Sequence, residues 1–487
     1  MNSFLKKYTV ALCAFMAVFT AIIPFTRAFF RLEINYNEGW NIFNATALVN
    51  RQSLYPIKYG WTSVNYPMLS FEILAQLHRF THEYLFTARV VSLLSLVACS
   101  LLVAAIVKTL NSSWRSSILA GLFCLAVFCA AANIYVGMDD PQMLAQVFFL
   151  LAFLTYLRHR RSLPAIAFTA LLFVVACFIK HNPIDFPLAV LIELILVSLP
   201  RAIWFSLCGI LFAAIAVLLS IRFGGPYFLA QILAQRSYSS LKIVGQLIKV
   251  IRPLLLPFCV AAYTAFRLRK DATRRIATIL FLTTLLVGSY FSGGQGVNIN
   301  ALFSAILAMS ILLGLFWDQI SSLRWQWTPR PQAAFAPLIL FIWLIIPMIQ
   351  SGNWLPIRAL RHAAAAQTRF DEDIAFLQSH PGPALCESLL ECNLAGKPYL
   401  YDTFNASALI RFRKLDADVF IDQILQHRFS AIQTDGLLPL VRDDSERWNP
   451  SIRDAIEANY VPALQHKDAA KYPYQNVVIY IPKAASR

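Results

Sequence analysis

A succession of long apolar runs through the first 350 residues constrains this chain more than any other feature. A helix of about 17–25 apolar residues is long enough to cross the roughly 30 Å of hydrocarbon in a bilayer. About eleven segments meet this criterion. They lie at residues 8–29, 84–107, 117–136, 141–157, 163–179, 183–199, 202–221, 253–266, 276–291, 301–317 and 333–349. The pattern therefore predicts an all-α polytopic membrane protein.

The overall composition agrees with this prediction. Of the 487 residues, 58% are apolar and only 14% are charged. Soluble domains carry about 45–50% apolar and about 25% charged residues. The excess of apolar side chains must face lipid rather than water, which excludes a soluble enzyme.

The basic residues predict the orientation of the spans. Lys and Arg number 42 against 26 Asp and Glu, a formal net charge of +16. In a membrane protein such an excess reflects basic cytoplasmic loops, so no nucleic-acid partner is expected. With a cytoplasmic N-terminus, every predicted inner segment is basic, through Lys6, Lys7, Lys108, Arg115, Arg158, Arg160, Arg161, Arg201, Arg267, Arg269, Lys270, Arg274, Arg275, Arg324 and Arg330. The first run is expected to stay as an uncleaved span, because no small-x-small cleavage site follows it.

This orientation leaves three long segments on the outer side, at residues 30–83, 222–252 and 351–487. In the second, two lysines stand among apolar positions at helical spacing, a pattern typical of a helix in the membrane interface. The third has a mixed, charged composition with helix-like and strand-like stretches. We therefore predict two domains. Residues 1–350 form the membrane domain with its large first outer loop at 30–83, and residues 351–487 form a small extracytoplasmic α/β domain.

Polar residues of several chemical types collect in the outer loops. They are Glu38, Asp139, Asp140, Lys180, His181, Arg222, and the glycines and asparagines of residues 293–300. Ionisable groups near a bilayer are costly and are therefore candidates for function. A carboxylate can take the proton of an acceptor hydroxyl, and cations can stabilise the charge on a departing phosphate. This mixture suits transfer from a lipid phosphate ester to an acceptor.

The outer motifs also carry a family resemblance. They are Tyr36-Asn-Glu-Gly-Trp-Asn41, Leu54-Tyr-Pro56, Asn65-Tyr-Pro67, Ala88-Arg-Val-Val-Ser92, Met138-Asp-Asp-Pro-Gln142, Phe178-Ile-Lys-His181, Gly293-Gly294 with Asn298 and Asn300, Leu385-Cys-Glu387, Gly396-Lys-Pro398 and Tyr401-Asp-Thr-Phe404. Together they resemble GT-C-type glycosyltransferases, and more narrowly the bacterial relatives of the protein mannosyltransferase and aminoarabinose transferase group. The sequence departs from the family where Asn37 replaces a frequent Asp and where His181 follows the lysine.

The resemblance implies an integral enzyme of the bacterial inner membrane. Such an enzyme moves a sugar from a polyprenyl-phosphate carrier to a cell-envelope glycan, lipid or protein, with inversion, at the outer face. Glu38 is then the general base or the carboxylate that orients the acceptor, helped by Asp139 or Asp140. A structural alternative exists for the two aspartates, because acids before Pro141 favour a helix start.

The same resemblance suggests which residues bind substrate. Lys180, aided by His181, Arg89 and Arg222, is expected to hold the donor phosphate, and Tyr66, Asn298 and Asn300 to contact substrate. Each set has a competing explanation. Arg89 and Arg222 can anchor helices at the interface, Lys180 can snorkel to water, and a turn between two spans accounts equally well for the asparagines.

The cysteines give one structural expectation. Seven of the nine lie in apolar runs, where a cysteine behaves as a small hydrophobe. Cys386 and Cys392 are candidates for a disulfide in an oxidising outer compartment, although sequence separation alone does not establish the pairing. The sequence has no metal-binding motif with zinc spacing, and any need for a divalent metal is left open.

Two other functions fit a membrane chain of this kind. A transporter or lipid-linked-sugar flippase without transferase activity would place charged or broken-helix positions near the bilayer midplane. Glu193 and the proline interruptions are the best such positions here. A scaffold whose outer domain recruits envelope partners would tolerate the joint loss of Glu38, Asp139 and Asp140.

Overall fold

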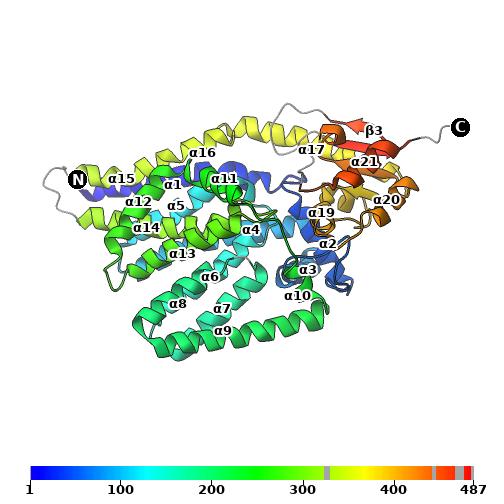
Figure 1. The fold of residues 1–487 in the computed structure, drawn as a ribbon. Helices are drawn as coiled ribbons and strands as arrows, with labels where there is room; N and C mark the ends of the chain where they lie inside the picture. Colours follow the sequence, from blue (N-terminus) through cyan, green and yellow to red (C-terminus); the bar gives the residue numbers. More distant parts are fainter. Residues whose placement is uncertain (1, 182, 323–329, 441–445, 467–476, 484–487) are drawn as a thin grey trace.

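A bundle of apolar helices forms the larger part of the molecule (Figure 1). The computed structural model describes residues 2–181, 183–322, 330–440, 446–466 and 477–483, so that Arg324 of the expected inner loops lies outside it. The helices of the bundle are α1 (Asn2–Arg27), α4 (Tyr84–Thr109), α5 (Trp114–Ala131), α6 (Gln142–Arg158), α7 (Leu163–Ile179), α8 (Asp185–Val197), α9 (Leu199–Leu219), α12 (Leu255–Leu268), α13 (Arg275–Ser292), α14 (Phe303–Ser322), α15 (Arg330–Trp343) and α16 (Ile345–Gln350).

Packing within the bundle follows the apolar character of these helices. Helix α4 packs against α5 and α6, α6 against α7, α13 against α8 and α14, and α1 against α5 and α15. Large apolar side chains are also exposed on the outside of the bundle, for example Leu207, Ile210 and Leu218 along α9. An apolar face that is exposed over a whole helix fits contact with lipid.

Every expected span contains one of these helices, but the number of about eleven spans is not confirmed. Among the described residues, six segments are long and apolar enough to cross a bilayer, namely Lys6–Arg27, Tyr84–Thr109, Trp114–Ala131, Leu199–Gly224, Arg275–Ser292 and Ile299–Ile320. Ser240–Ile251 and Leu255–Leu268 count as a seventh only if taken together, and they are bent by 96°. Other apolar helices are shorter: α8 has 13 residues, whereas a straight span needs about 20.

The first two outer segments are also helical. The first contains α2 (Asn37–Val49) and α3 (Leu69–Thr81), and the second contains η2 (Ser220–Gly224), α10 (Phe228–Ile232) and α11 (Ser240–Ile251). Short turns η1 (Asn133–Tyr135) and η3 (Ile299–Leu302) precede α6 and α14. Helix α11 exposes Leu241, Val244 and Ile248 while burying Val250. This amphipathic pattern fits the expected helix in the membrane interface.

The last part of the chain forms a small α/β unit, here called the outer module (residues 356–483). Its elements are α17 (Pro356–Ser379), β1 (Ala384–Cys386), α18 (Leu389–Leu394), α19 (Thr403–Arg411), α20 (Asp418–Leu425), β2 (Ala431–Thr434), η4 (Leu438–Leu440), α21 (Pro450–Asn459), β3 (Tyr460–Gln465) and β4 (Val478–Pro482). The strand order is β1-β2-β4-β3, with β1 parallel to β2 and the other pairs antiparallel.

Successive side chains of a strand point to opposite faces of the sheet, and both faces are apolar here. Leu385, Ile432 and Val478 pack with side chains of α20 and α21, while Ala431 and Ile479 pack with side chains of α17. The second cluster also includes Leu32, Ile42 and Leu85 from the first outer segment and the start of α4. The outer module is therefore packed on the first outer segment, at the end of the bundle away from the N-terminus (Figure 1). Its place outside the cell remains a prediction.

Candidate functional site

A small, partly open pocket lies where the bundle meets the first outer segment, here called the cavity. Its polar lining consists of Asn41, Ser70, Ser92, Asp139 and Asp140. The apolar part of the lining consists of Phe71, Ile73, Leu74, Leu77, Ala88, Val91, Pro141 and Leu144. These residues come from α2, α3, α4, α6 and the loop before α6. The cavity thus combines acids with an apolar wall.

Glu38 and Arg89 form a buried ion pair next to this cavity, with 0% and 1% of each residue exposed. Arg89 Nε donates to Glu38 Oε1 at 2.8 Å, and Nη2 donates to Oε2 at 2.7 Å. The remaining Arg89 donors go to the carbonyl oxygens of Ala28, Phe30 and Leu32. Glu38 also accepts from the backbone N–H groups of Ile34 at 2.7 Å and Asp139 at 3.1 Å.

These contacts occupy both groups completely. A guanidinium has five N–H donors and a carboxylate about four acceptor sites. The sequence predicts Glu38 as the base and Arg89 as a phosphate ligand, but neither side chain has a hydrogen-bonding position left for a substrate. The pair instead joins the first outer segment to α4 and to the loop that carries Asp139. Arg89 thus has a structural role, as the buried partner of Glu38 and not as the interfacial anchor considered from the sequence.

Asp139 and Asp140 lie in the loop before α6 and line the cavity. Asp140 Oδ1 accepts from the N–H of Gln142 at 2.7 Å, which is the helix-start role considered for it. The Oδ2 atoms of both aspartates are buried, and no described residue hydrogen-bonds to either. Burial, together with the nearby charges of Glu38 and Asp140, raises the pKa of Asp139 well above its usual range. Asp139 Oδ2 is therefore a free acidic oxygen, whereas Asp140 Oδ2 lies 3.5 Å from the ammonium group of Lys180.

Lys180 ends α7 with only 1% of its surface exposed. Its Nζ lies 3.5 Å from Asp140 Oδ2 and 3.7 Å from the centre of the Tyr66 ring. His181 packs edge-on against the same ring, with ring centres 5.9 Å apart. Lys180 thus points into the protein and does not snorkel to water. Burial, with the charges of Arg236 and Lys180, lowers the pKa of His181 to about 3, so the imidazole is neutral.

Two further residues belong to this region, and the sequence analysis gives them no role. Asn41, one turn after Glu38, donates to the carbonyl oxygen of Asp139 at 2.7 Å. Arg236, between α10 and α11, is close enough to His181 and Tyr66 to interact with them electrostatically. Its buried Nη2 finds no hydrogen-bond partner in the part of the chain that the structure describes. The sequence could have pointed to Asn41, because it follows Glu38 by one helical turn. No pattern near Arg236 in the sequence indicates that it belongs to the site.

Three expected binding residues lie elsewhere. Arg222 is exposed in η2, with its guanidinium 5.7 Å from the ring of Phe223. Asn298 is exposed, and its side chain accepts from the next backbone N–H at the start of η3. Asn300 lines a separate small pocket with Gln142 and Asp185. The turn explanation therefore fits Asn298, while Arg222 has a surface position.

The glycine-rich turn before Asn298 allows the backbone to pack closely against aromatic side chains. Gly296 has a positive φ of 72°, and a Cβ on it would lie 2.2 Å from the ring of Phe404 in the outer module. A Cβ on Gly293 would lie 2.7 Å from the ring of Tyr238. Ser239 N–H donates to Gly293 O at 2.9 Å, which joins the turn to the second outer segment. These glycines permit close contacts within the protein.

The outer module contains the expected cysteine pair, since Cys386 and Cys392 form a disulfide. The other seven cysteines are free thiols. Within the described residues, no group of three His, Cys, Asp or Glu side chains is placed to hold a metal ion.

Comparison with known proteins shows what this fold is similar to. No family model and no curated protein matches the sequence. ArnT from Cupriavidus metallidurans has a similar structure in the apo state, with a TM-score of 0.61 and 13% identity over 96% of this chain and 98% of ArnT. ArnT bound to undecaprenyl phosphate gives the same score and identity over 97% and 98%.

A second structural relative is archaeal. The oligosaccharyltransferase AglB from Archaeoglobus fulgidus, in complex with an inhibitory peptide and a dolichol-phosphate, gives a TM-score of 0.53 at 9% identity, over 98% of this chain and 76% of AglB. ArnT and AglB are both GT-C glycosyltransferases. The chain therefore has the GT-C fold, which confirms the resemblance seen in the outer motifs at the level of the fold.

Proposed function

We propose that this chain is a glycosyltransferase that moves a sugar from a polyprenyl-phosphate carrier to a hydroxyl group of a cell-envelope acceptor. The observation that carries the proposal is a set of buried polar atoms without hydrogen-bond partners among the described residues. They are Asp139 Oδ2, Asp140 Oδ2, Lys180 Nζ, His181 Nδ1 and Arg236 Nη2, of which Asp140 Oδ2 and Lys180 Nζ face each other as an ion pair at 3.5 Å. Buried polar atoms are normally paired, so this set fits a site that a polar ligand completes. The GT-C fold and the carrier lipids bound by ArnT and AglB support the same proposal.

In this proposal Asp139 is the general base. Its Oδ2 is free and lines the cavity, while Glu38 is occupied by Arg89. The raised pKa suits the role, because a base works best when its pKa lies near the working pH. Asp139 takes the acceptor's hydroxyl proton as that oxygen attacks the anomeric carbon. The bond between this carbon and the phosphate oxygen breaks, the configuration inverts, and polyprenyl phosphate leaves.

Lys180 and Arg236 then hold the phosphate. Both cations have a buried nitrogen that a phosphate oxygen would satisfy. Their positive charge stabilises the negative charge that grows on the leaving phosphate. Neutral His181, between them, offers a hydrogen bond without adding charge. Tyr66, whose ring faces both Lys180 and His181, fixes their positions.

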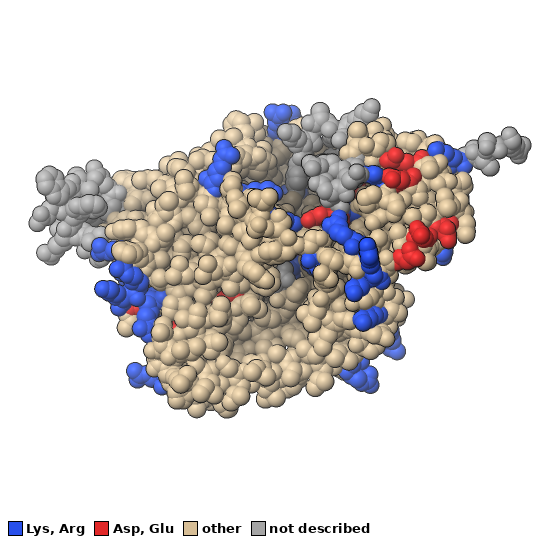
Figure 2. Space-filling model, viewed as in Figure 1, with Lys and Arg blue, Asp and Glu red and all other residues tan. Residues whose placement is uncertain are grey.

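The same proposal includes the orientation predicted from the sequence. Lys and Arg side chains lie at both ends of the molecule, whereas the face of the bundle between them carries few charges (Figure 2). An uncharged belt between charged ends fits a bundle that spans a membrane, and the basic residues of the expected inner segments favour a cytoplasmic N-terminus. The proposed site then lies at the outer face, where envelope acceptors are found.

Transport without transfer is less well supported. Glu193, the acid inside a predicted span, is paired with Arg275 at 3.1 Å and Arg160 at 3.9 Å. Both arginines belong to segments expected on the cytoplasmic side. A paired acid at that end of the bundle has a structural explanation and does not mark a translocation path.

The test uses the full chain in lipid nanodiscs, a panel of polyprenyl-phosphate sugars, and envelope extract as the source of acceptor. Released polyprenyl phosphate is measured. We expect release by wild type and by Asp418→Asn, which changes an exposed acid of the outer module. Asp139→Asn should be slower by about 10²–10⁴-fold. Folded wild-type protein that releases nothing from any donor would contradict the proposal and favour transport or scaffolding.

A further inference from the structure

The outer module touches the proposed site through a short loop that a disulfide closes. Cys386 ends β1, Cys392 lies in α18, and the bond between them encloses residues 386–392. Helix α18 packs directly on α2, the helix that carries Glu38 and Asn41. The contact is tight at Gly39, where a Cβ would lie 2.1 Å from the backbone nitrogen of Leu390. Only a glycine allows the two backbones to approach this closely.

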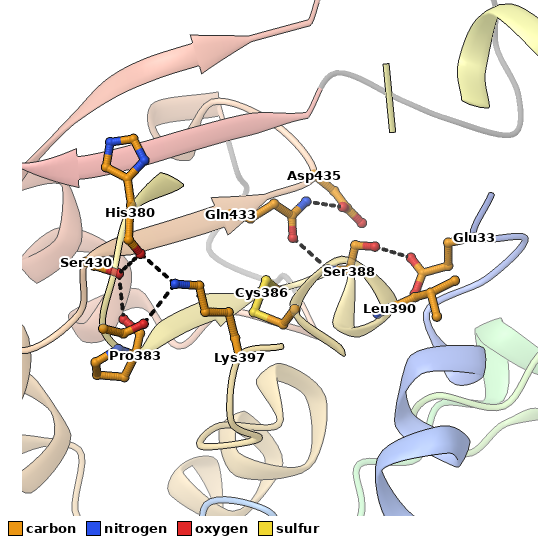
Figure 3. The surroundings of a disulfide bond; sticks show 12 residues. Glu33, His380, Pro383, Cys386, Ser388, Leu390, Lys397, Ser430, Gln433 and Asp435 are labelled. Atoms are coloured by element: carbon orange, nitrogen blue, oxygen red, sulfur yellow. Dashed lines mark hydrogen bonds between the residues drawn. A yellow bond between two sulfur atoms is a disulfide. The ribbon is translucent and has the colours of Figure 1, made fainter. Parts of the chain in front are cut away.

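Glu33 makes a second connection to the same loop (Figure 3). Its carboxyl group accepts from the Ser388 hydroxyl and, at 3.3 Å, from the N–H of Leu390. Glu33 and Gly39 lie on either side of Glu38 in the sequence. Residues 33–39 are thus attached at both ends to the middle of the disulfide-closed loop.

The sheet fixes the other side of this loop. Gln433 on β2 accepts from the N–H of Glu387 through its carbonyl oxygen at 3.0 Å, and from the N–H of Ser388 through its side chain at 2.8 Å. These bonds hold the residues that follow β1. The disulfide ties α18 covalently back to β1, and it adds to the packing of Leu390 in the core cluster that contains Ala431 and Ile479 of the sheet.

We propose that the loop 386–392, closed by its disulfide, is the positioning device of the catalytic site. By holding residues 33–39 it fixes Glu38, and Glu38 in turn holds the backbone N–H of Asp139 at 3.1 Å. Glu33 and Gly39 are accordingly positioning residues, although neither touches the cavity. Assembly of the site then depends on oxidation of one cysteine pair. The effect on turnover rests on the proposed transferase function, whereas the effect on structure does not.

The redox step involves this pair alone. On oxidation, two thiols lose two protons and two electrons to a disulfide oxidant of the outer compartment, through thiol–disulfide exchange. The other seven cysteines are already thiols. Cys386 and Cys392 are each 2% exposed, so an external reductant reaches them slowly. Substitution is therefore a better test than reduction.

The test compares wild type with Cys386→Ala/Cys392→Ala and with Cys259→Ala, which removes an exposed free thiol. Hydrogen–deuterium exchange is measured on the full chain in nanodiscs. We expect the amides of Ile34 and Asp139, which donate to Glu38, to exchange at least about tenfold faster in the double variant only. Exchange at wild-type rates in residues 33–41 and at Asp139 would overturn the proposal.

Polyprenyl phosphate release is measured on the same samples. A shift of about 1 Å in a reacting group costs up to about 10²-fold in rate, so kcat should fall by about tenfold to hundredfold. The KM for the donor should change less, because Lys180 and Arg236 lie on other segments. Faster exchange in a protein whose wild type releases nothing would support the positioning device and contradict the transferase.

A second variant covers the case in which the cysteine variant does not fold. Gly39→Ala keeps the disulfide but forces α2 and α18 apart, because its Cβ would overlap the backbone of Leu390. We expect faster exchange in residues 33–41 and at Asp139, with α17 unchanged. Gly245→Ala is the matched control, since no atom lies within 4 Å of a Cβ added there. Identical exchange in both glycine variants would contradict the proposal.

Discussion

Glu38 and Arg89, 51 positions apart, meet in a buried two-point ion pair with hydrogen bonds of 2.8 and 2.7 Å. The pair connects the first outer segment to α4, and through the Asp139 N–H it also reaches the loop before α6. Groups from three segments, which come together only in the folded protein, therefore meet at the carboxylate of Glu38. Since this acid has no free acceptor position, the proposed function gives the role of base to Asp139.

The first prediction distinguishes a structural role of Glu38, as the ion-pair partner of Arg89, from a catalytic role. In Glu38→Gln the buried Arg89 loses its counter-charge, and breaking a buried pair in this way costs about 3–5 kcal/mol. We expect thermal unfolding in nanodiscs at a clearly lower temperature, together with slower polyprenyl phosphate release. Asp139→Asn is the matched comparison. We expect this variant to lose polyprenyl phosphate release while it unfolds at the same temperature as the wild type. Full stability in Glu38→Gln combined with loss of release would return the role of base to Glu38.

The second prediction concerns the pH dependence of the reaction. Asp139 lies outside the spanning helices, and burial raises its pKa well above the usual range. A base acts only when deprotonated, so kcat/KM should rise with pH, with a midpoint well above that of an ordinary aspartate. The measurement is a pH–rate profile of the wild type. A rising limb centred near the ordinary aspartate pKa of about 3.9 would argue against Asp139 as the base.

The arrangement of the helices follows from the sequence more directly than the site does. The expected run at residues 163–179 and α7 have the same bounds, because uninterrupted apolar residues are flanked by Ser162 and Lys180. Long apolar runs determine where helices form, since lipid leaves the backbone few other ways to satisfy its hydrogen bonds. The number of spans is harder to predict, because α8 and the bent pair α11–α12 are shorter or less straight than their apolar runs suggest.

The candidate site was predictable where polar residues stand at the ends of apolar runs. Asp139, Asp140 and Lys180 stand at helix ends, and the sequence alone indicates that they share one side of the membrane. The sequence does not predict which group Arg89 binds. Whether its guanidinium pairs with Glu38 or with a phosphate depends on how α2 and α4 pack. Arg236 reaches His181 only after the second outer segment folds back. Asn298 has the composition of a binding residue, but its side chain caps its own turn.

The third prediction uses the pH dependence of stability. Burial, with smaller contributions from Asp435 and Glu38, raises the pKa of Glu33 to about 8. Between the ordinary glutamate pKa of about 4.3 and this value, the folded protein holds a proton that the unfolded chain has lost. Stability should therefore fall as pH rises through this window.

Thermal unfolding between pH 5 and pH 9 checks this prediction. Glu33→Gln removes the titrating group while keeping an acceptor for the Ser388 hydroxyl, so its unfolding temperature should change less with pH than that of the wild type. Asp371→Asn, at an exposed position in α17, is the control and should follow the wild type. Equal slopes for wild type and Glu33→Gln would show that Glu33 does not hold this proton.

The last prediction concerns the two cations assigned to the donor phosphate. If Lys180 and Arg236 bind the same phosphate group, Lys180→Gln and Arg236→Gln should each weaken donor binding by about tenfold or more, because each removes a charge-assisted hydrogen bond of about 1.5–3 kcal/mol. The double variant should lose less than the sum of the two free energies, since neighbouring groups that share a ligand are coupled. Donor KM and kcat for the four proteins give this coupling, and Arg79→Gln, at an exposed position of α3, is the control. Strict additivity would place the two cations on separate groups, and an Arg236→Gln variant that behaves like the control would remove Arg236 from the site.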